Sequence, residues 1–153
     1  MTRCTAGVAG FTLAELLVVL AIVALLGAVA YPSYSRQVVK SRRVEAQLAL
    51  VDTMQRQEQF RAQHRSYLAF SSQADTEAAH QFKWWLGRDA AASAYELDGY
   101  ACPGHEIEEC IELRARPGTD NVDAGFADDE CGTLTYSSTG AQGASGPSER
   151  CWP

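Results

Sequence analysis

Apolar residues are concentrated in one run near the start of the chain, over residues 11–31. This run of 21 residues contains a single ionisable side chain, that of Glu15. As an α-helix it would be about 31 Å long, which matches the roughly 30 Å hydrocarbon core of a bilayer. The pattern therefore predicts a membrane-spanning helix over 11–31, behind a short leader of residues 1–10.

The pattern beyond the run predicts that the helix continues over residues 32–65. Between 33 and 65 the chain is rich in Ala, Gln, Glu, Arg and Leu and has no Gly or Pro. Pro32 removes a helical hydrogen bond and Gly27 lowers helix propensity, so together they predict a kink at the end of the apolar run. One apolar face is expected to pack on a folded domain, opposite a polar face. The apolar face consists of Val44, Leu48 and Val51, widened by Leu50 and Met54, and the polar face of Arg43, Gln47, Arg56 and Glu58.

The last third of the chain has the short alternating segments that are typical of an antiparallel sheet. These segments are residues 95–100, 107–115 and 132–137, with a fourth short strand expected after Gly140. Residues 66–92 lack periodicity and predict a connecting loop. The loop contains Trp84 and Trp85, which are either core residues beside the sheet or a contact surface for a subunit or ligand.

The positions of the cysteines indicate the compartment in which the chain folds, and its net charge restricts the partners that it can bind. Four of the five cysteines lie in the polar last third, which favours two disulfides formed outside the cytoplasm, while Cys4 lies in the leader. The formal net charge of −6 disfavours a nucleic-acid partner, because a DNA-binding protein needs a basic face. With 153 residues the chain has room for one globular domain.

The junction between the leader and the run resembles the processing site of type IV prepilins with a class III leader. Gly10 is followed by Phe11-Thr12-Leu13-Ala14-Glu15-Leu16, close to the usual Gly then FTLIEL, with Ala14 in place of Ile. The resemblance implies cleavage after Gly10 by a prepilin peptidase, N-methylation of Phe11 and retention of the helix. It also implies that Glu15 pairs with the N-terminal amine of Phe11 on a neighbouring subunit and sets the register of assembly.

Glu15 also needs a physical explanation, because a charged side chain at the centre of a membrane helix costs roughly 2.5–3.5 kcal/mol. We expect its carboxylate to have no partner within its own apolar run. The alternative to the assembly role is that it reaches the headgroups and gains from the helix dipole. Basic residues after the run would place the C-terminus in the cytoplasm by the positive-inside rule. The cysteines and the junction favour the opposite orientation, with a periplasmic C-terminus.

Further similarities narrow the family. Residues 41–47, 55–60 and 65–67 resemble the helix of PilE-type minor pilins, and residues 131–136 with Gly140 and Cys151-Trp152 resemble their C-terminal disulfide-bounded region. The implied fold is α+β, a long N-terminal helix packed on a small antiparallel sheet. The implied parts are the leader 1–10, the membrane helix 11–31, its amphipathic continuation 32–65 and the head 66–153.

The resemblance implies a structural subunit, without enzymatic activity or a cofactor. Its partners would be other pilin subunits, the prepilin peptidase, the pilus assembly machinery and the inner membrane, and after assembly it would lie in an extracellular pilus. Twitching motility and adhesion are the expected roles. The alternatives are a pseudopilin of a type II secretion system and a membrane-anchored binding module, for example in DNA uptake.

Four head cysteines allow three pairings, of which we predict Cys131 with Cys151 and Cys102 with Cys110. The first pair bounds a Gly- and Ser-rich segment with little apolar surface, and the second flanks the turn signal Pro103-Gly104. A Cys110–Cys131 link is the alternative.

Other chemistry is less well supported by the sequence. A zinc site of Cys102, His105, Cys110 and Cys131 lacks the usual ligand spacing, and the acidic stretch 120–130 has Val122 and Ala124 where a calcium loop needs oxygen ligands. We therefore expect no metal. His64, His80 and His105 accompany no recognisable nucleophile motif.

Overall fold

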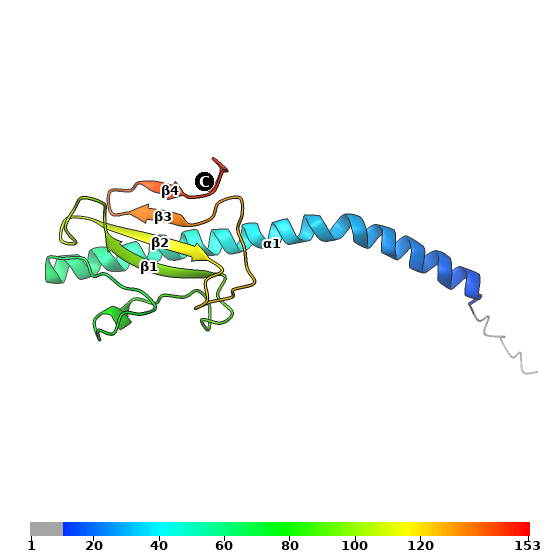
Figure 1. Cartoon of the computed structure of the whole chain (residues 1–153), viewed down its shortest axis with the longest axis horizontal. Helices are drawn as coiled ribbons and strands as arrows, with labels where there is room; N and C mark the ends of the chain where they lie inside the picture. The colour runs from blue at the N-terminus through cyan, green and yellow to red at the C-terminus, as the bar shows by residue number, and fades with distance from the viewer. Residues whose placement is uncertain (1–10) are drawn as a thin grey trace, which may run out of the picture. The chain divides into compact units, whose positions relative to one another are not determined.

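A computed structural model describes residues 11–153, except for the side chains of residues 29–33. The predicted leader, with Cys4 and Gly10, lies outside the described residues. The chain contains one long helix and one sheet (Figure 1). The elements are α1 (Leu13–His64), a short 3₁₀ helix η1 (Ala79–Gln81), β1 (Tyr95–Ala101), β2 (Ile111–Pro117), β3 (Leu134–Ser137) and β4 (Gln142–Ala144). The chain divides between Val38 and Val39 into two compact units.

Helix α1 is continuous from Leu13 to His64, which confirms the predicted helix after residue 32. It passes through Gly27 and Pro32, and the kink expected there stays a prediction because the side chain of Pro32 is not described. Among the described residues, no helical stretch combines the length and apolarity needed to cross a bilayer. Large apolar side chains from Leu13 to Leu26 are nevertheless more than half exposed.

The four strands form one antiparallel sheet in the order β1-β2-β3-β4, as in the predicted fold class (Figure 1). Leu97 lies opposite Ala115, Leu113 opposite Tyr136, and Thr135 opposite Gly143. The second strand begins at Ile111 and not at residue 107, because residues 106–110 form a turn in which the Cys110 amide donates to the Glu106 carbonyl.

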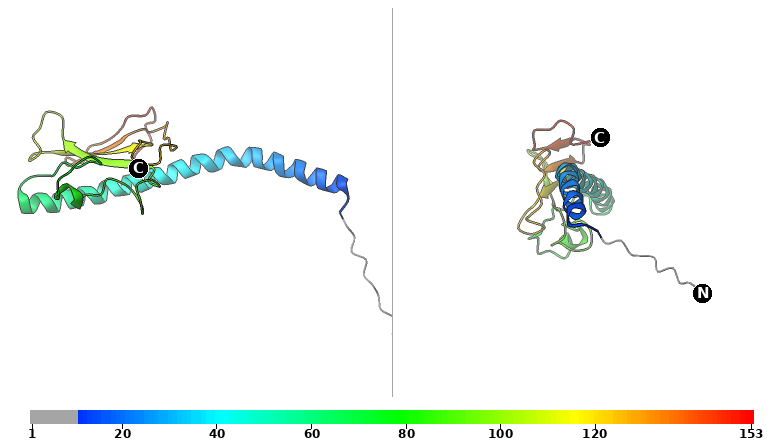
Figure 2. Two further views of the ribbon diagram at one scale, coloured as in Figure 1. Left: turned by 60° about the horizontal axis from the view of Figure 1, so that its bottom comes forward. Right: turned by 90° about the vertical axis from the view of Figure 1, so that its right-hand side faces the viewer.

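The sheet packs on the second half of α1, through a helix face that overlaps only in part with the one predicted (Figure 2). Ala46, Leu50 and Met54 are buried, whereas Val44 and Leu48 are 47% and 66% exposed. The prediction was right for Leu50 and Met54 and wrong for Val44 and Leu48, because the buried face is completed by polar side chains, whose groups find partners inside the fold. Gln57, for example, is fully buried and exchanges hydrogen bonds with the backbone of Leu68 at 2.8 and 3.0 Å.

The segment between α1 and β1 is largely irregular, as predicted, and it runs along the outer edge of β1. Phe70 and Gly99 exchange both backbone hydrogen bonds, and the Leu97 amide donates to the Trp84 carbonyl at 2.7 Å. A Cβ on Gly99 would lie 2.7 Å from the Phe70 ring, so this close approach requires glycine.

Two disulfides have the predicted connectivity. Cys102–Cys110 closes the turn between β1 and β2, and Cys131–Cys151 ties the C-terminal segment to the start of β3. All four cysteines are buried. The side-chain amide of Gln47 on α1 also donates to the Cys151 carbonyl.

Candidate functional site

The start of α1 is organised by a reciprocal pair, Thr12 and Glu15. The Glu15 carboxylate accepts hydrogen bonds from the Thr12 amide and hydroxyl, both at 2.9 Å, and the Glu15 amide donates to the Thr12 hydroxyl at 3.3 Å. This is a capping box, in which two otherwise unpaired helix amides gain partners. The expectation that Glu15 has no partner within its own run was therefore wrong. The Thr-x-x-Glu spacing of the sequence could have revealed the pair.

A buried ion pair joins α1 to the segment before β3. The Arg43 guanidinium contacts both oxygens of Asp128, at 2.8 and 2.7 Å, and Glu130 at 3.0 Å. The Tyr95 hydroxyl and the Cys131 amide also donate to Asp128. Burial alone would raise the pKa of Asp128, but the Arg43, Tyr95 and Cys131 donors and the charge of Arg43 outweigh it and hold that pKa below its usual range. Sequence analysis had placed Arg43 on the solvent-facing side.

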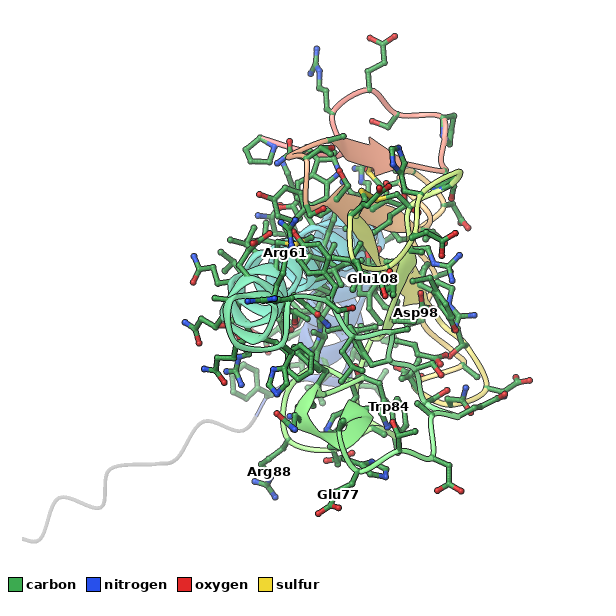
Figure 3. All side chains as sticks on the ribbon, turned by 90° about the vertical axis from the view of Figure 1, so that its left-hand side faces the viewer. Arg61, Glu77, Trp84, Arg88, Asp98 and Glu108 are labelled. Carbon is green, nitrogen blue, oxygen red and sulfur yellow. A yellow bond between two sulfur atoms is a disulfide. The ribbon has the colours of Figure 1, made fainter. Side chains whose placement is uncertain are left out.

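Two more carboxylates are buried on the sheet face opposite α1. Glu96 and Asp98 alternate with the core residues of β1 and are fully buried, and Figure 3 shows Asp98 on the side away from the helix. Arg114 and Arg116 of β2 lie 2.7–3.1 Å from them. Burial would raise the pKa of Glu96, but hydroxyl and amide donors and the charge of Arg116 keep it below its usual value. These donors come from Ser72, Thr119 and Asn121.

Residues 82–88, here called the tryptophan turn, pack between α1 and β1. Phe82 and Leu86 are buried in the core and anchor the turn, and the Leu86 amide donates to the Ser93 hydroxyl at 2.8 Å. Gly87 has φ +66°, a conformation that favours glycine. Trp84 and Trp85, each partly buried, meet edge to face at 4.9 Å. The pair is thus neither fully core nor fully exposed.

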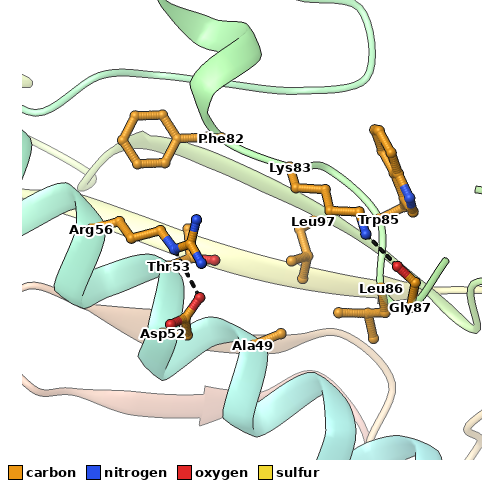
Figure 4. Close-up of a pocket in the computed structure, with 10 residues that line it drawn as sticks. All are labelled: Ala49, Asp52, Thr53, Arg56, Phe82, Lys83, Trp85, Leu86, Gly87 and Leu97. Carbon is orange, nitrogen blue, oxygen red and sulfur yellow. Dashed lines mark hydrogen bonds and ion pairs between the residues drawn. The ribbon is translucent and has the colours of Figure 1, made fainter. Parts of the chain in front are cut away.

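A hollow of about 200 Å³ lies between the tryptophan turn and α1 (Figure 4). Ala49, Phe82, Leu86 and Leu97 contribute its apolar wall, and Thr53, Trp85 and Gly87 also line it. Two cations reach it. Arg56 pairs with Asp52 at 2.9 Å, and the Lys83 ammonium donates to the Gly87 carbonyl and lies 4.9 Å from the centre of the Trp85 ring.

The tryptophan turn also carries Arg88, which points away from the body of the domain in Figure 3. Within residues 11–153, neither Lys83 nor Arg88 has an acidic side chain within ion-pair distance. Several other arginines of residues 39–153 are paired with carboxylates, among them Arg43, Arg56, Arg114 and Arg116. The turn therefore combines two aromatic rings with two cations that are available to an anionic partner.

Other candidate residues are not brought together. The zinc alternative fails because its cysteines form disulfides, and His105 instead lies 3.4 Å from Glu109. In the acidic stretch, Asp128 is committed to Arg43, and Asp123 accepts the Gly125 amide. Across the described part of the chain, no group of three or more His, Cys, Asp and Glu side chains is placed to hold a metal ion.

Two family profiles match the chain. The prokaryotic N-terminal methylation motif matches residues 6–31, and the profile described as "Type IV minor pilin ComP, DNA uptake sequence receptor" matches residues 32–135, more than half of the chain. The chain belongs to the type IV minor pilin ComP family. The predicted identity as a type IV minor pilin is confirmed, and so is the helix-on-sheet fold class with its two disulfides.

Among solved structures, this minor pilin is similar to a type IV pilin from Shewanella oneidensis. The two chains share 22% identity with a TM-score of 0.46, over 75% of this chain and 98% of the other. No curated protein matches the chain.

Proposed function

We propose that this minor pilin is a filament subunit whose head binds DNA. The chain would be cut between Gly10 and Phe11 and methylated at Phe11, in keeping with the methylation motif over 6–31. It would then stand in the inner membrane with a periplasmic head until the assembly machinery moves it into the pilus. The exposed apolar side chains between Leu13 and Leu26 support this proposal, because such a surface calls for lipid or other helices around it.

We still propose that Glu15 acts in assembly, but its carboxylate already has hydrogen bonds in the isolated subunit. Its carboxylate now bonds to Thr12, so pairing with the Phe11 amine of a neighbouring subunit would add to these bonds or replace them. A carboxylate accepts several hydrogen bonds at once, which makes a shared arrangement possible.

Processing is tested on full-length protein extracted from membranes. Its intact mass should correspond to loss of residues 1–10 and gain of one methyl group. A mature chain that still begins at Met1, or one that begins after Tyr31, would contradict the proposed processing.

DNA binding by the head is the function that the family description and the tryptophan turn support together. The sequence analysis discounted nucleic acid on net charge, but net charge averages over surfaces that act separately. Several acidic side chains of this pilin are paired with arginines, whereas Lys83 and Arg88 beside the tryptophans have no acidic partner among the described residues. Local charge, and not the total of −6, is the relevant quantity.

The experiment measures binding of fluorescent duplex DNA to the full-length pilin in detergent, at several salt concentrations. The double variant Lys83→Gln/Arg88→Gln should bind more weakly at every sequence and lower the slope of log K against log salt by about 2. Arg150→Gln is the matched control, because it removes an exposed cation that follows β4, the strand at the opposite edge of the sheet from β1, which the turn adjoins (Figure 1). Equal binding by wild type and the double variant would refute the proposed site.

The roles in twitching and adhesion that the sequence suggested are separate hypotheses. Both can be scored in the same deletion strain as DNA uptake. Loss of uptake with normal twitching and normal piliation would favour the receptor function over a general role in pilus assembly.

A further inference from the structure

The Trp85 indole nitrogen is a donor without an acceptor. Its Nε1 atom is buried and makes no hydrogen bond to any described residue. Buried N–H groups nearly always have a partner, so an orphan of this kind calls for an explanation. The indole of Trp152, which is also partly buried, donates to the Gly143 carbonyl at 2.8 Å.

A second donor lies over the same ring. The Lys83 ammonium is 4.9 Å from the centre of the Trp85 ring and donates one proton to the Gly87 carbonyl. An ammonium group has three protons and no acceptor, so it has donors to spare. Figure 4 shows the ammonium, the Gly87 carbonyl and the nitrogen-bearing edge of the indole at one end of the hollow. This end thus offers several donors and a single protein acceptor.

The surroundings are compatible with an anion at this place. Arg56 and Asp52 both line the hollow and pair at 2.9 Å, so they add no net charge, and the Lys83 ammonium is the cation that remains without a carboxylate. Gly87 leaves the backbone without a side chain beside the donors. The apolar wall lowers the local dielectric, which strengthens a charge-assisted hydrogen bond.

We infer that Trp85 Nε1 and Lys83 Nζ form a subsite for one phosphate oxygen, at the end of the hollow beside Gly87. The exposed lysine side chain would swing from the Gly87 carbonyl to the phosphate and open the indole N–H to the same oxygen or its neighbour. This inference rests on the proposed DNA binding and deepens it, because it names a backbone phosphate as the bound group. Inorganic phosphate offers the same chemistry and serves as the simplest probe.

Two variants separate the donors. Trp85→Phe removes the N–H and keeps a ring under Lys83, so DNA affinity should fall roughly threefold to tenfold with an unchanged salt slope, as expected for a lost neutral donor. Lys83→Gln removes a charge and should also lower the salt slope by about 0.9. Trp152→Phe is the matched control, because its N–H has an internal partner.

The direct test uses full-length pilin labelled with ¹⁵N only in tryptophan, in detergent. The chain has three tryptophans and so gives three indole signals, of which Trp85→Phe identifies one. Duplex DNA should shift the Trp85 indole signal, and inorganic phosphate should shift it at higher concentration. Sodium chloride of equal ionic strength should leave the Trp85 signal in place, and none of these solutes should shift the Trp152 signal. A Trp85 signal that neither probe moves would overturn the subsite.

The outcomes also separate this inference from the proposed function. DNA binding with a stationary Trp85 signal would refute the phosphate subsite and leave the receptor function standing. A phosphate-dependent shift of the Trp85 signal without measurable DNA binding would support the phosphate subsite and refute the receptor function.

Discussion

Arg43→Met is the most informative single change in the head. Methionine keeps an unbranched apolar chain in place of the arginine methylene stem but removes the guanidinium that contacts both oxygens of Asp128. The side chains of Arg43 and Asp128 are 7% and 0% exposed, so water cannot replace the lost partner without a rearrangement.

The expected loss follows from these contacts. Removing one member of a buried ion pair costs about 3–5 kcal/mol, because the remaining charge is left without compensation. Asp128 would keep the Tyr95 hydroxyl at 2.6 Å and the Cys131 amide at 3.2 Å, which argues for the lower end. The Glu130 contact adds little, because that side chain is 66% exposed. We expect a loss of about 3 kcal/mol, or a fall in Tm of roughly 10–15 °C.

The assay is thermal and urea unfolding of the oxidised full-length pilin in detergent, followed by circular dichroism. Arg42→Met is the matched control, because the neighbouring arginine pairs with Glu45 at 3.1 Å while 47% exposed and should cost about 0.5 kcal/mol or less. Asp128→Asn in the Arg43→Met background should recover part of the loss, since it removes the uncompensated charge. A loss below about 1 kcal/mol, or additive effects of the two substitutions, would refute this account.

Three further predictions concern the pH dependence, a disulfide and assembly. Asp128 and Glu96 have lowered pKa values, so the stabilisation that their carboxylates contribute should be complete above the ordinary carboxyl pKa of about 4. It should disappear as the pH falls through their pKa values in the folded protein. Urea midpoints that stay level from pH 6 to about pH 3 would contradict this. Replacing both Cys131 and Cys151 by Ser should cost about 3 kcal/mol, since the bridge closes a loop with a sequence separation of 20, and equal urea stability of the oxidised and variant proteins would count against it. Glu15→Ala should be processed normally but recovered poorly in sheared filaments, and normal recovery by immunoblot would favour the headgroup-reaching alternative.

Local sequence signals predicted the order of elements and the disulfide pairs. The helix over 33–65 follows from its composition, and the strands from alternation bounded by turn residues. The pairing of Cys102 with Cys110 could be predicted because both flank a tight turn. Each of these features depends on residues that are close in sequence.

The helix face and the tryptophan turn depend on distant contacts, and the sequence did not reveal them. Arg43 is polar by type but buried, because its partner Asp128 is 85 residues away. Val44 is apolar but exposed, so apolar spacing alone includes side chains that do not pack on the sheet. Lys83 and Arg88 of the tryptophan turn have no acidic partner among the described residues, which is a property of the folded head and not of composition.

Residues 70 and 84–85 pair with the outer edge of β1, and this pairing affects how readily the sheet could aggregate. An exposed strand edge presents unpaired backbone groups that can pair with another chain. Here Phe70 and Trp84 take up backbone groups of β1 on one side of the sheet, and β4, on the other side, is only three residues long and contains a glycine. Neither edge offers a long template for strand addition. The head therefore presents little free strand backbone through which the sheet of another chain could pair with it.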